Sequence, residues 1–347
     1  MGKVVLVTGV SRYLGGRFAE RLMQQPGIDR VIGVDVVPPP HSIGGAEFVR
    51  ADIRNPVIAK VISQADVDTV AHLNVIATPL SAGGRVSMKE INVIGTMQLL
   101  AACQKAPSVR HLVVKSSAAV YGSSPRDPAM FTEDTGAKSL PRSGFGKDSV
   151  EVEGYVRGFA RRRPDVGLSV LRFANIIGPG IATPMTDYFT MPVIPTVFGF
   201  DARLQFVHED DALAAMLLAT AGTGVGTVNV AGDGVLALSQ AARIAGRPTV
   251  PVPLVAGAWV GQVVRRSGLA DFSPEQMQFL AYGRGLDTTR MRTVLKFEPR
   301  FTTRSAFEDF LAAGRGSPPV VMPALAGAVG GAERVVLDSV DRLRPAS

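Results

Sequence analysis

The chain has 347 residues, of which 46% are hydrophobic and 19% are charged, and its formal net charge is +7. This length can bury one large core, or a main domain together with a smaller one. The single cysteine, Cys103, excludes an internal disulfide framework and is typical of a protein in a reducing cytosol, so we expect a cytoplasmic location. The first strand begins almost at the amino terminus, so we expect no signal peptide, and no apolar stretch reaches the roughly 18 residues of a membrane span.

The positive charge raises the question of a nucleic-acid partner. The densest basic cluster comprises Arg157, Arg161, Arg162 and Arg163. It lies between a helical stretch and the strand 168–173, where arginines commonly cap a helix carboxyl end, and no interleaved aromatic residues accompany it. We therefore predict no nucleic-acid partner. A basic surface that attracts small anionic ligands explains the charge more economically.

The first element is a buried strand that leads into a glycine turn. Residues 4–7 are all apolar, Thr8 and Gly9 turn the chain, and Gly15 and Gly16 open a helical pattern near 15–25. An apolar run of this kind suits a central parallel strand. At such a turn, backbone N–H groups and the positive helix end can bind a pyrophosphate, so this segment is predicted to be a phosphate loop.

The second predicted strand, 31–34, ends in Asp35, which stands 26 positions after Gly9. A carboxylate at this place can accept hydrogen bonds from both ribose hydroxyls of an adenine dinucleotide. Strand, loop, helix, strand and terminal acid in this order predict a dinucleotide site, with NAD as the expected cofactor.

Apolar strands and helical segments continue to alternate along the chain. This rhythm predicts an α/β fold, a Rossmann-type doubly wound parallel sheet. The strands are expected at 4–7, 31–34, 47–49, 69–73, 112–115 and 168–172, and the helices near 15–25, 55–63, 88–105 and 147–162.

The order breaks into short Gly/Pro-punctuated pieces after Ile176. We therefore expect a dinucleotide-binding domain at 1–177 and a smaller mixed substrate domain at 178–314, with segments near 204–232 returning to the main sheet. The remainder, 315–347, is expected to be a tail with a terminal helix. Ligands of such sheets bind at the carboxyl ends of the strands.

Eight motifs make the chain resemble the extended short-chain dehydrogenase/reductase family, in its NAD-dependent epimerase/dehydratase branch, which includes UDP-glucose 4-epimerases. The match spans about 1–310. The motifs are Val7-Thr8-Gly9, Asp35, Ala51-Asp52-Ile53-Arg54, Val70-Ala71-His72-Leu73, Asn92 to Thr96, Ser116 to Gly122, Leu171 to Pro179 and Phe206 to Asp211.

The resemblance implies roles for individual residues. Asp52 would meet the adenine edge, Leu73 would line the nicotinamide side, and Ser117, with Ser116 adjacent, would touch the reacting oxygen. A nucleotide sugar would be the small-molecule ligand, and a homodimer would form through the helices near 88–105 and 147–162. The implied cofactor-binding residues are Gly9, Arg12, Tyr13, Leu14, Gly15, Asp35, Asp52, Ile53, Leu73, Asn74 and Asn92, and the implied substrate-binding residues are Tyr121, Asn175, Arg203 and His208.

The chain departs from the family at the acid/base positions. The family needs a tyrosine and a lysine one helical turn later, because the lysine lowers the pKa of the phenol and holds the nicotinamide ribose. Here Phe145 and Ser149 occupy these positions. A phenyl ring cannot exchange a proton, and Lys147, two positions after Phe145, points to another side of the helix. We therefore predict an atypical active site.

Two further departures concern binding. Arg12 replaces the middle glycine of the phosphate loop, where its guanidinium either clamps a phosphate or lies on an abandoned loop. A clamp would also allow NADP, whereas Asp35 favours NAD by repelling a 2′-phosphate. The arginine with which the epimerases grip the sugar diphosphate is replaced by Leu204, with Arg203 out of phase on an extended strand.

Three functions remain open on the sequence. The first is a dinucleotide-binding protein with weak, altered or no oxidoreductase chemistry. The second is an active epimerase, dehydratase or reductase in which Ser116, Ser117, His208 or a substrate group supplies the proton. The third is an interaction module without cofactor. His72 and His208 are interpreted as structural, and no metal site is predicted.

Overall fold

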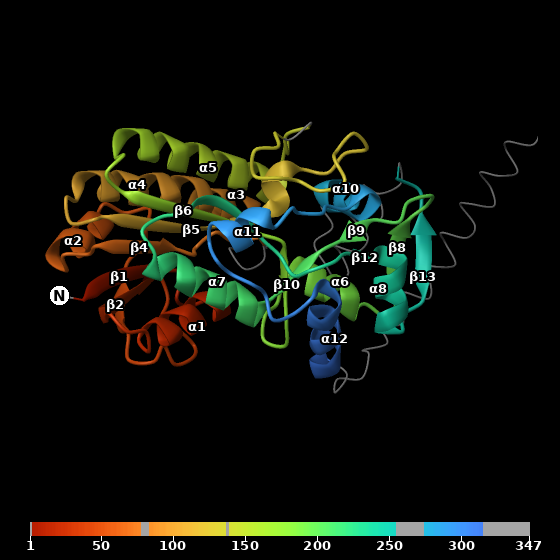
Figure 1. Ribbon diagram of the computed structural model, residues 1–347, viewed down its shortest axis with the longest axis horizontal. Coiled ribbons are helices and arrows are strands. Elements are labelled where there is room, and N and C mark those ends of the chain that lie inside the picture. Colours follow the sequence, from red (N-terminus) through yellow and green to blue (C-terminus); the bar gives the residue numbers. More distant parts are fainter. Residues whose placement is uncertain (1, 78–82, 137–138, 255–273, 315–347) are drawn as a thin grey trace, which may run out of the picture.

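A seven-stranded parallel sheet forms the centre of the computed structural model, which describes residues 2–77, 83–136, 139–254 and 274–314 (Figure 1). The strand order is β11-β6-β5-β4-β1-β2-β3, so the order reverses between β1 and β4, and this reversal confirms the predicted doubly wound fold. The strands are β1 (Lys3–Thr8), β2 (Ile28–Asp35), β3 (Glu47–Arg50), β4 (Thr69–His72), β5 (His111–Ser117), β6 (Gly167–Phe173) and β11 (Gly226–Val230).

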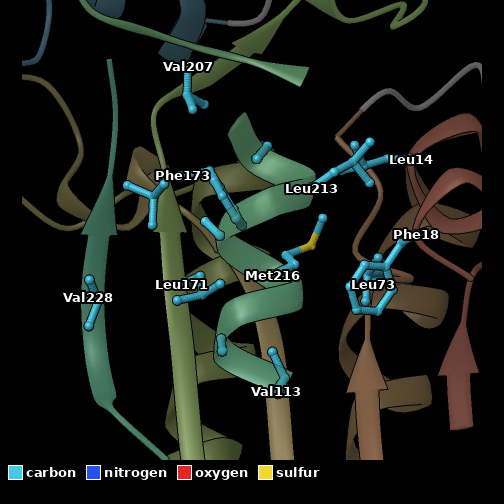
Figure 2. Close-up of a cluster of buried hydrophobic side chains, with 14 of the residues drawn as sticks. Leu14, Phe18, Leu73, Val113, Leu171, Phe173, Val207, Leu213, Met216 and Val228 are labelled. Atoms are coloured by element: carbon cyan, nitrogen blue, oxygen red, sulfur yellow. The ribbon is translucent and has the colours of Figure 1, made fainter. Parts of the chain in front are cut away.

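Helices cover both faces of this sheet. One face packs against α1 and α7, and Figure 2 shows Leu213 and Met216 of α7 among Leu171 and Phe173 of β6 and Phe18 of α1. The other face packs against α2, α4 and α5. The helices of this layer structure are α1 (Tyr13–Leu22), α2 (Val57–Gln64), α3 (Arg85–Lys89), a π-helical turn (Glu90–Gly95), α4 (Thr96–Lys105), a 3₁₀ turn (Ala118–Tyr121), α5 (Gly144–Arg162) and α7 (Glu209–Ala221).

A smaller mixed region lies beyond the carboxyl ends of the strands (Figure 1). Its core contains Phe307, whose ring stacks on Phe206 at 5.6 Å and meets Phe189 edge-on at 4.7 Å between centroids. Its elements are β7 (Asn175–Ile177), α6 (Pro184–Thr190), β8 (Ile194–Val197), β9 (Arg203–Leu204), β10 (Phe206–His208), β12 (Leu236–Ala237), α8 (Leu238–Ala245), β13 (Thr249–Val252), α10 (Pro274–Tyr282), α11 (Thr289–Thr293) and α12 (Thr303–Gly314).

The expected terminal helix in 315–347 lies outside the described residues. Within the described ranges, no helix has both the length and the apolar character that a bilayer span requires.

The basic cluster contains a helix cap, at the end of α4 and not of the preceding helix α5. Arg163 follows α5 and donates from Nη1 to the carbonyls of Cys103 and Ala106, at 3.1 and 3.2 Å, at the end of α4. Its Nη2 donates to the carbonyl of Val109 at 3.0 Å. Cys103 itself is buried, and burial raises the pKa of its thiol to about 12, so it packs as a small hydrophobe.

Candidate functional site

The turn between β1 and α1 has the geometry of a phosphate loop. Gly9 has a φ of +83°, and a Cβ there would lie 3.1 Å from the Cα of Asn74. A Cβ on Gly15 would lie 2.1 Å from the carbonyl oxygen of Gly9. Both positions therefore require glycine, which brings the backbone of the first turn of α1, including Tyr13 and Leu14, to the sheet edge. The free N–H groups of such a turn form an anion site.

Asp35 closes this loop at the end of β2. Its Oδ2 accepts hydrogen bonds from the backbone N–H of Ser11 at 3.1 Å and from the Ser11 hydroxyl at 2.5 Å. Its Oδ1 accepts from the Val36 N–H at 2.8 Å, and the residue is only 6% exposed. Because a carboxylate oxygen has two lone pairs, Oδ1 retains acceptor capacity toward a ribose hydroxyl.

An open pocket of about 720 Å³ lies beside Asp35, at the ends of β2 and β3, and Val36, Asp52 and Lys60 are among the residues that line it. The Asp52 carboxylate accepts from Arg54 Nη2 at 2.7 Å, and this bond lowers the pKa of Asp52. Ile53 is buried. The pocket lies where the adenine is expected, and an adenine amino group would share Asp52 with Arg54.

The end of β4 is held by a hydrogen-bond chain. His72 Nδ1 lies 2.8 Å from the Thr8 hydroxyl, and Nε2 lies 2.8 Å from the Thr96 hydroxyl. Burial lowers the pKa of His72 to about 3, with a smaller contribution from Lys115. The imidazole is therefore neutral and structural, as interpreted from the sequence. The Leu73 N–H donates to Thr8 at 3.2 Å.

Asn92 braces the loop that follows β4. Its side chain accepts from the Ile76 N–H at 2.8 Å and donates to the Ile76 carbonyl at 2.9 Å. Asn74, 9% exposed, lies in the same loop against Gly9. Residues of the glycine loop and of the segment after β4 thus lie together at the carboxyl ends of β1 and β4.

The acid/base positions lie in the first two turns of α5. Phe145 is half-buried, and Ser149 is 1% exposed, with its hydroxyl donating to the Phe145 carbonyl at 2.9 Å. Lys147 Nζ lies 3.9 Å from Glu151 on the same helix. Between them, Asp148 is fully buried and accepts from Arg85 at 2.5 and 2.7 Å. This turn carries a structural ion pair that the sequence did not reveal.

The two serines of the Ser116-Ser117 pair face different surroundings. Ser117 Oγ accepts from the Ala119 N–H at 3.1 Å, where the 3₁₀ turn begins. Ser116 is buried, and its hydroxyl donates to Glu153 Oε1 at 2.6 Å. Ser117 is therefore the serine with a partly exposed side chain, whereas Ser116 belongs to the packing between β5 and α5.

Tyr121 lies in a buried polar network. Its hydroxyl donates to Asn229 Oδ1 and accepts from Arg172 Nη1, both at 2.8 Å. Arg172 also forms a two-bond ion pair with Glu153, at 2.6 and 2.9 Å. Tyr121 is 2% exposed and its hydroxyl has two hydrogen-bond partners, and the substrate contact expected of it stays a prediction.

The other expected substrate residues differ in their burial. His208 is buried, stacks on Phe301 at 3.8 Å, and its Nε2 lies 3.1 Å from Asp309. Arg203 is exposed, whereas Leu204 is fully buried, as the alternation of an extended strand predicts. Asn175 begins β7 opposite Phe206.

Two contacts at the carboxyl ends of the strands were not predicted from the sequence. Tyr13 donates to Glu209 at 2.7 Å, and Glu209 accepts from the Gly180 N–H at 3.0 Å, so the phosphate loop is fastened to the segment after β7. Lys115 on β5 donates to the Val75 carbonyl at 3.1 Å. The available signal for Lys115 was a lysine directly after three apolar strand residues, 112–114, and two positions before Ser117.

Arg12 stands at the N-cap of α1, half-buried, and burial lowers the pKa of its guanidinium while the Asp35 carboxylate opposes that shift. We expect Arg12→Gly to weaken dinucleotide binding by roughly 1.5–3 kcal/mol, because charge-assisted hydrogen bonds to phosphate would be lost. Calorimetric titration checks this, with Arg17→Ala on the same helix as the control. Tighter binding by the glycine variant would mean that Arg12 obstructs the loop.

Comparisons with known proteins agree with this geometry. The family model described as NAD dependent epimerase/dehydratase family matches residues 5–231. An uncharacterized protein of Mycobacterium tuberculosis (strain ATCC 25618 / H37Rv) is 51% identical over 326 residues, which cover 92% of this chain and 86% of that protein.

Two solved structures share the fold. UDP-glucose 4-epimerase of Thermotoga maritima, with UDP-glucose, has a TM-score of 0.69 at 21% identity and covers 90% of this chain and 99% of its own. The second structure is a tyrosine-to-phenylalanine variant of UDP-glucuronic acid 4-epimerase from Bacillus cereus, in complex with a UDP-sugar analogue and NAD. It has a TM-score of 0.68 at 18% identity, and the match covers 90% of this chain and 99% of that protein.

Proposed function

Because the chain belongs to the NAD-dependent epimerase/dehydratase family, we propose that it binds NAD at the carboxyl ends of its parallel strands. We propose further that it lacks the proton transfer that the family performs with a tyrosine and a lysine. One contrast carries the proposal. The positions of the loop glycines, the Asp35 carboxylate and the end of β4 support dinucleotide binding. The first two turns of α5 instead carry Phe145, Asp148 in an ion pair with Arg85 of α3, and Ser149, whose hydroxyl donates to the Phe145 carbonyl.

Binding and proton transfer are separable in this family's architecture. The phosphate loop and Asp35 would hold the adenosine and pyrophosphate through backbone amides and a carboxylate. When bound, NAD supplies hydride chemistry. Without a positioned acid/base, that chemistry loses roughly 10²–10⁴-fold in rate. The Bacillus cereus neighbour supports the separation, since that protein carries a tyrosine-to-phenylalanine substitution and still holds NAD.

The proposal extends to the ligand of the smaller region. Neighbours hold UDP-glucose or UDP-glucuronic acid, so we propose a nucleotide sugar as the small-molecule ligand of this chain. Leu204 stands where the epimerases carry an arginine, and the adjacent Arg203 is exposed, so the diphosphate would have to be held by other groups. We also propose a homodimer through α4 and α5, a cytoplasmic location, and domains that meet near residue 177.

We expect NAD(H) to raise the melting temperature more than NADP(H), because the Asp35 carboxylate accepts ribose hydroxyls and repels a 2′-phosphate. The difference in affinity should be at least about tenfold, or about 1.4 kcal/mol. Thermal-shift titrations with both cofactors measure it, and Asp35→Ala should abolish the gap.

Ser11→Ala is the matched control for this prediction. It removes the hydroxyl that donates to Asp35 but leaves the carboxylate and the Ser11 backbone bond in place, so the preference should persist. Equal shifts by both cofactors in the unmodified protein would refute the assignment of Asp35, and no shift by either at millimolar concentration would refute the proposed function.

A further inference from the structure

Lys115 lies near the carboxyl end of β5, where we propose the dinucleotide crevice. Side chains alternate along β5, so Lys115 shares a face with Val113 and Ser117. Val113 packs on the α1 and α7 side of the sheet, the side on which the phosphate loop enters α1. Lys115 Nζ reaches across to β4 and donates to the Val75 carbonyl at 3.1 Å, just after the end of that strand.

The surroundings of this amine do not stabilise a positive charge. Within the described part of the chain, no carboxylate lies within ion-pair distance of Lys115, and its hydrogen-bond acceptor is a neutral carbonyl. Burial lowers the pKa of Lys115 to about 8, and the Arg12 guanidinium contributes to the shift. A half-buried ammonium beside a second cation costs folding free energy, so the fold alone does not explain its position.

The topology fixes which half of a dinucleotide would lie nearest to Lys115. The adenosine belongs at Asp35 and the pyrophosphate at the loop from Gly9 to Gly15. The other half must then extend to the ends of β4 and β5, where Val75, Lys115 and Ser117 lie. The nicotinamide ring carries a positive charge when oxidised and none when reduced, so an ammonium there repels only the oxidised ring.

We propose that the crevice prefers NADH over NAD and that Lys115 sets this preference. The inference rests on the proposed dinucleotide site and adds the redox state of its ligand. A protein that holds the cofactor without a positioned acid/base would then be occupied according to the ratio of reduced to oxidised dinucleotide, and would respond to that ratio by binding alone.

The test compares the two redox forms on the full-length protein. NADH is titrated by its own fluorescence, and NAD by displacement of bound NADH at pH 7. We expect NADH to bind about tenfold more tightly, as a unit charge several ångströms from the ring predicts. Lys115→Met should bring the ratio of Kd values close to one, whereas Lys115→Arg should preserve it. Lys105→Met, at the exposed end of α4, is the matched control and should leave the ratio of the two Kd values unchanged.

The ratio should also depend on pH. Among the described groups that face Lys115, Arg12 remains charged, and His72, with a pKa of about 3, remains neutral. The amine loses its positive charge as the pH rises through about 8, so the preference for NADH should be largest at pH 7 and shrink by pH 9.5. The pH dependence, together with the ratio measured for Lys115→Arg, tests the role of Lys115 even if Lys115→Met does not fold.

Two results would overturn the inference while leaving the proposed function intact. One is equal affinity of the unmodified protein for NADH and NAD. The other is an equal loss of affinity for both forms in Lys115→Met, which would assign the amine to the pyrophosphate. Failure of either form to bind at millimolar concentration would overturn both proposals.

Discussion

Replacing Phe145 by tyrosine and Ser149 by lysine in one protein is expected to create NAD-linked turnover, roughly 10²–10⁴-fold above the unmodified chain. The tyrosine restores a proton donor at the start of α5. The lysine restores the cation that lowers the pKa of the phenol one turn later. The Ser149 hydroxyl donates to the Phe145 carbonyl, so its replacement removes one local hydrogen bond. Other contacts, such as the Arg85–Asp148 ion pair, still stabilise this helix.

The measurement is the initial rate of NADH formation or consumption with simple alcohol and carbonyl substrates, together with UDP-glucose epimerisation. Each single substitution should raise the rate only slightly, because the tyrosine and the lysine act as a unit. Adding Ser117→Ala to the double variant should lower its rate, since that serine would touch the reacting oxygen. Robust turnover by the unmodified chain that persists in Ser117→Ala would show that the chemistry lies on other residues.

Glu153→Gln is expected to destabilise the protein by about 3–5 kcal/mol, because it removes one partner of a buried ion pair. Glu153 binds Arg172 through two hydrogen bonds, and the two side chains are 5% and 12% exposed. The nearly isosteric amide keeps the packing but leaves the guanidinium beside Tyr121 without its counter-ion. The midpoint of chemical denaturation measures the loss.

Glu151→Gln provides the control from the same helix. Its carboxylate lies 3.9 Å from Lys147, and both side chains are substantially exposed, so the change should cost less than about 1 kcal/mol. Equal effects of the two substitutions would contradict the structural role assigned to the network. That network also explains why Tyr121 and Ser116 pack the interior.

The sequence predicts the sheet well because its signals are local. An apolar run that leads into Gly9 marks β1, and an apolar run that ends in Asp35 marks β2. This acid lies within one βαβ unit of the phosphate loop. The structure places Asp35 against that loop, with its carboxylate bonded to Ser11. The fold and the position of Asp35 beside the glycine loop could therefore be predicted from spacing and residue type.

The side-chain partners could not be predicted in the same way. Arg85 and Asp148 are 63 positions apart, and Tyr13 and Glu209 are 196 positions apart. No local pattern connects such pairs, since they meet only when separate elements pack. Tyr121 shows the same difficulty, because an aromatic residue in the turn after a strand fits a ligand contact or a buried network equally well. In the structure its hydroxyl bonds to Asn229 and Arg172, which are 108 and 51 positions away in the sequence.

The most direct test of the account is a calorimetric titration of the full-length protein with NADH in the absence of any substrate. We predict saturable binding of one dinucleotide per chain, weakened by Arg12→Gly and by Asp35→Ala, with no change in the 340 nm absorbance of the bound cofactor over the experiment. Absence of saturable binding at millimolar NADH would contradict the central claim that this sheet edge is a working dinucleotide site.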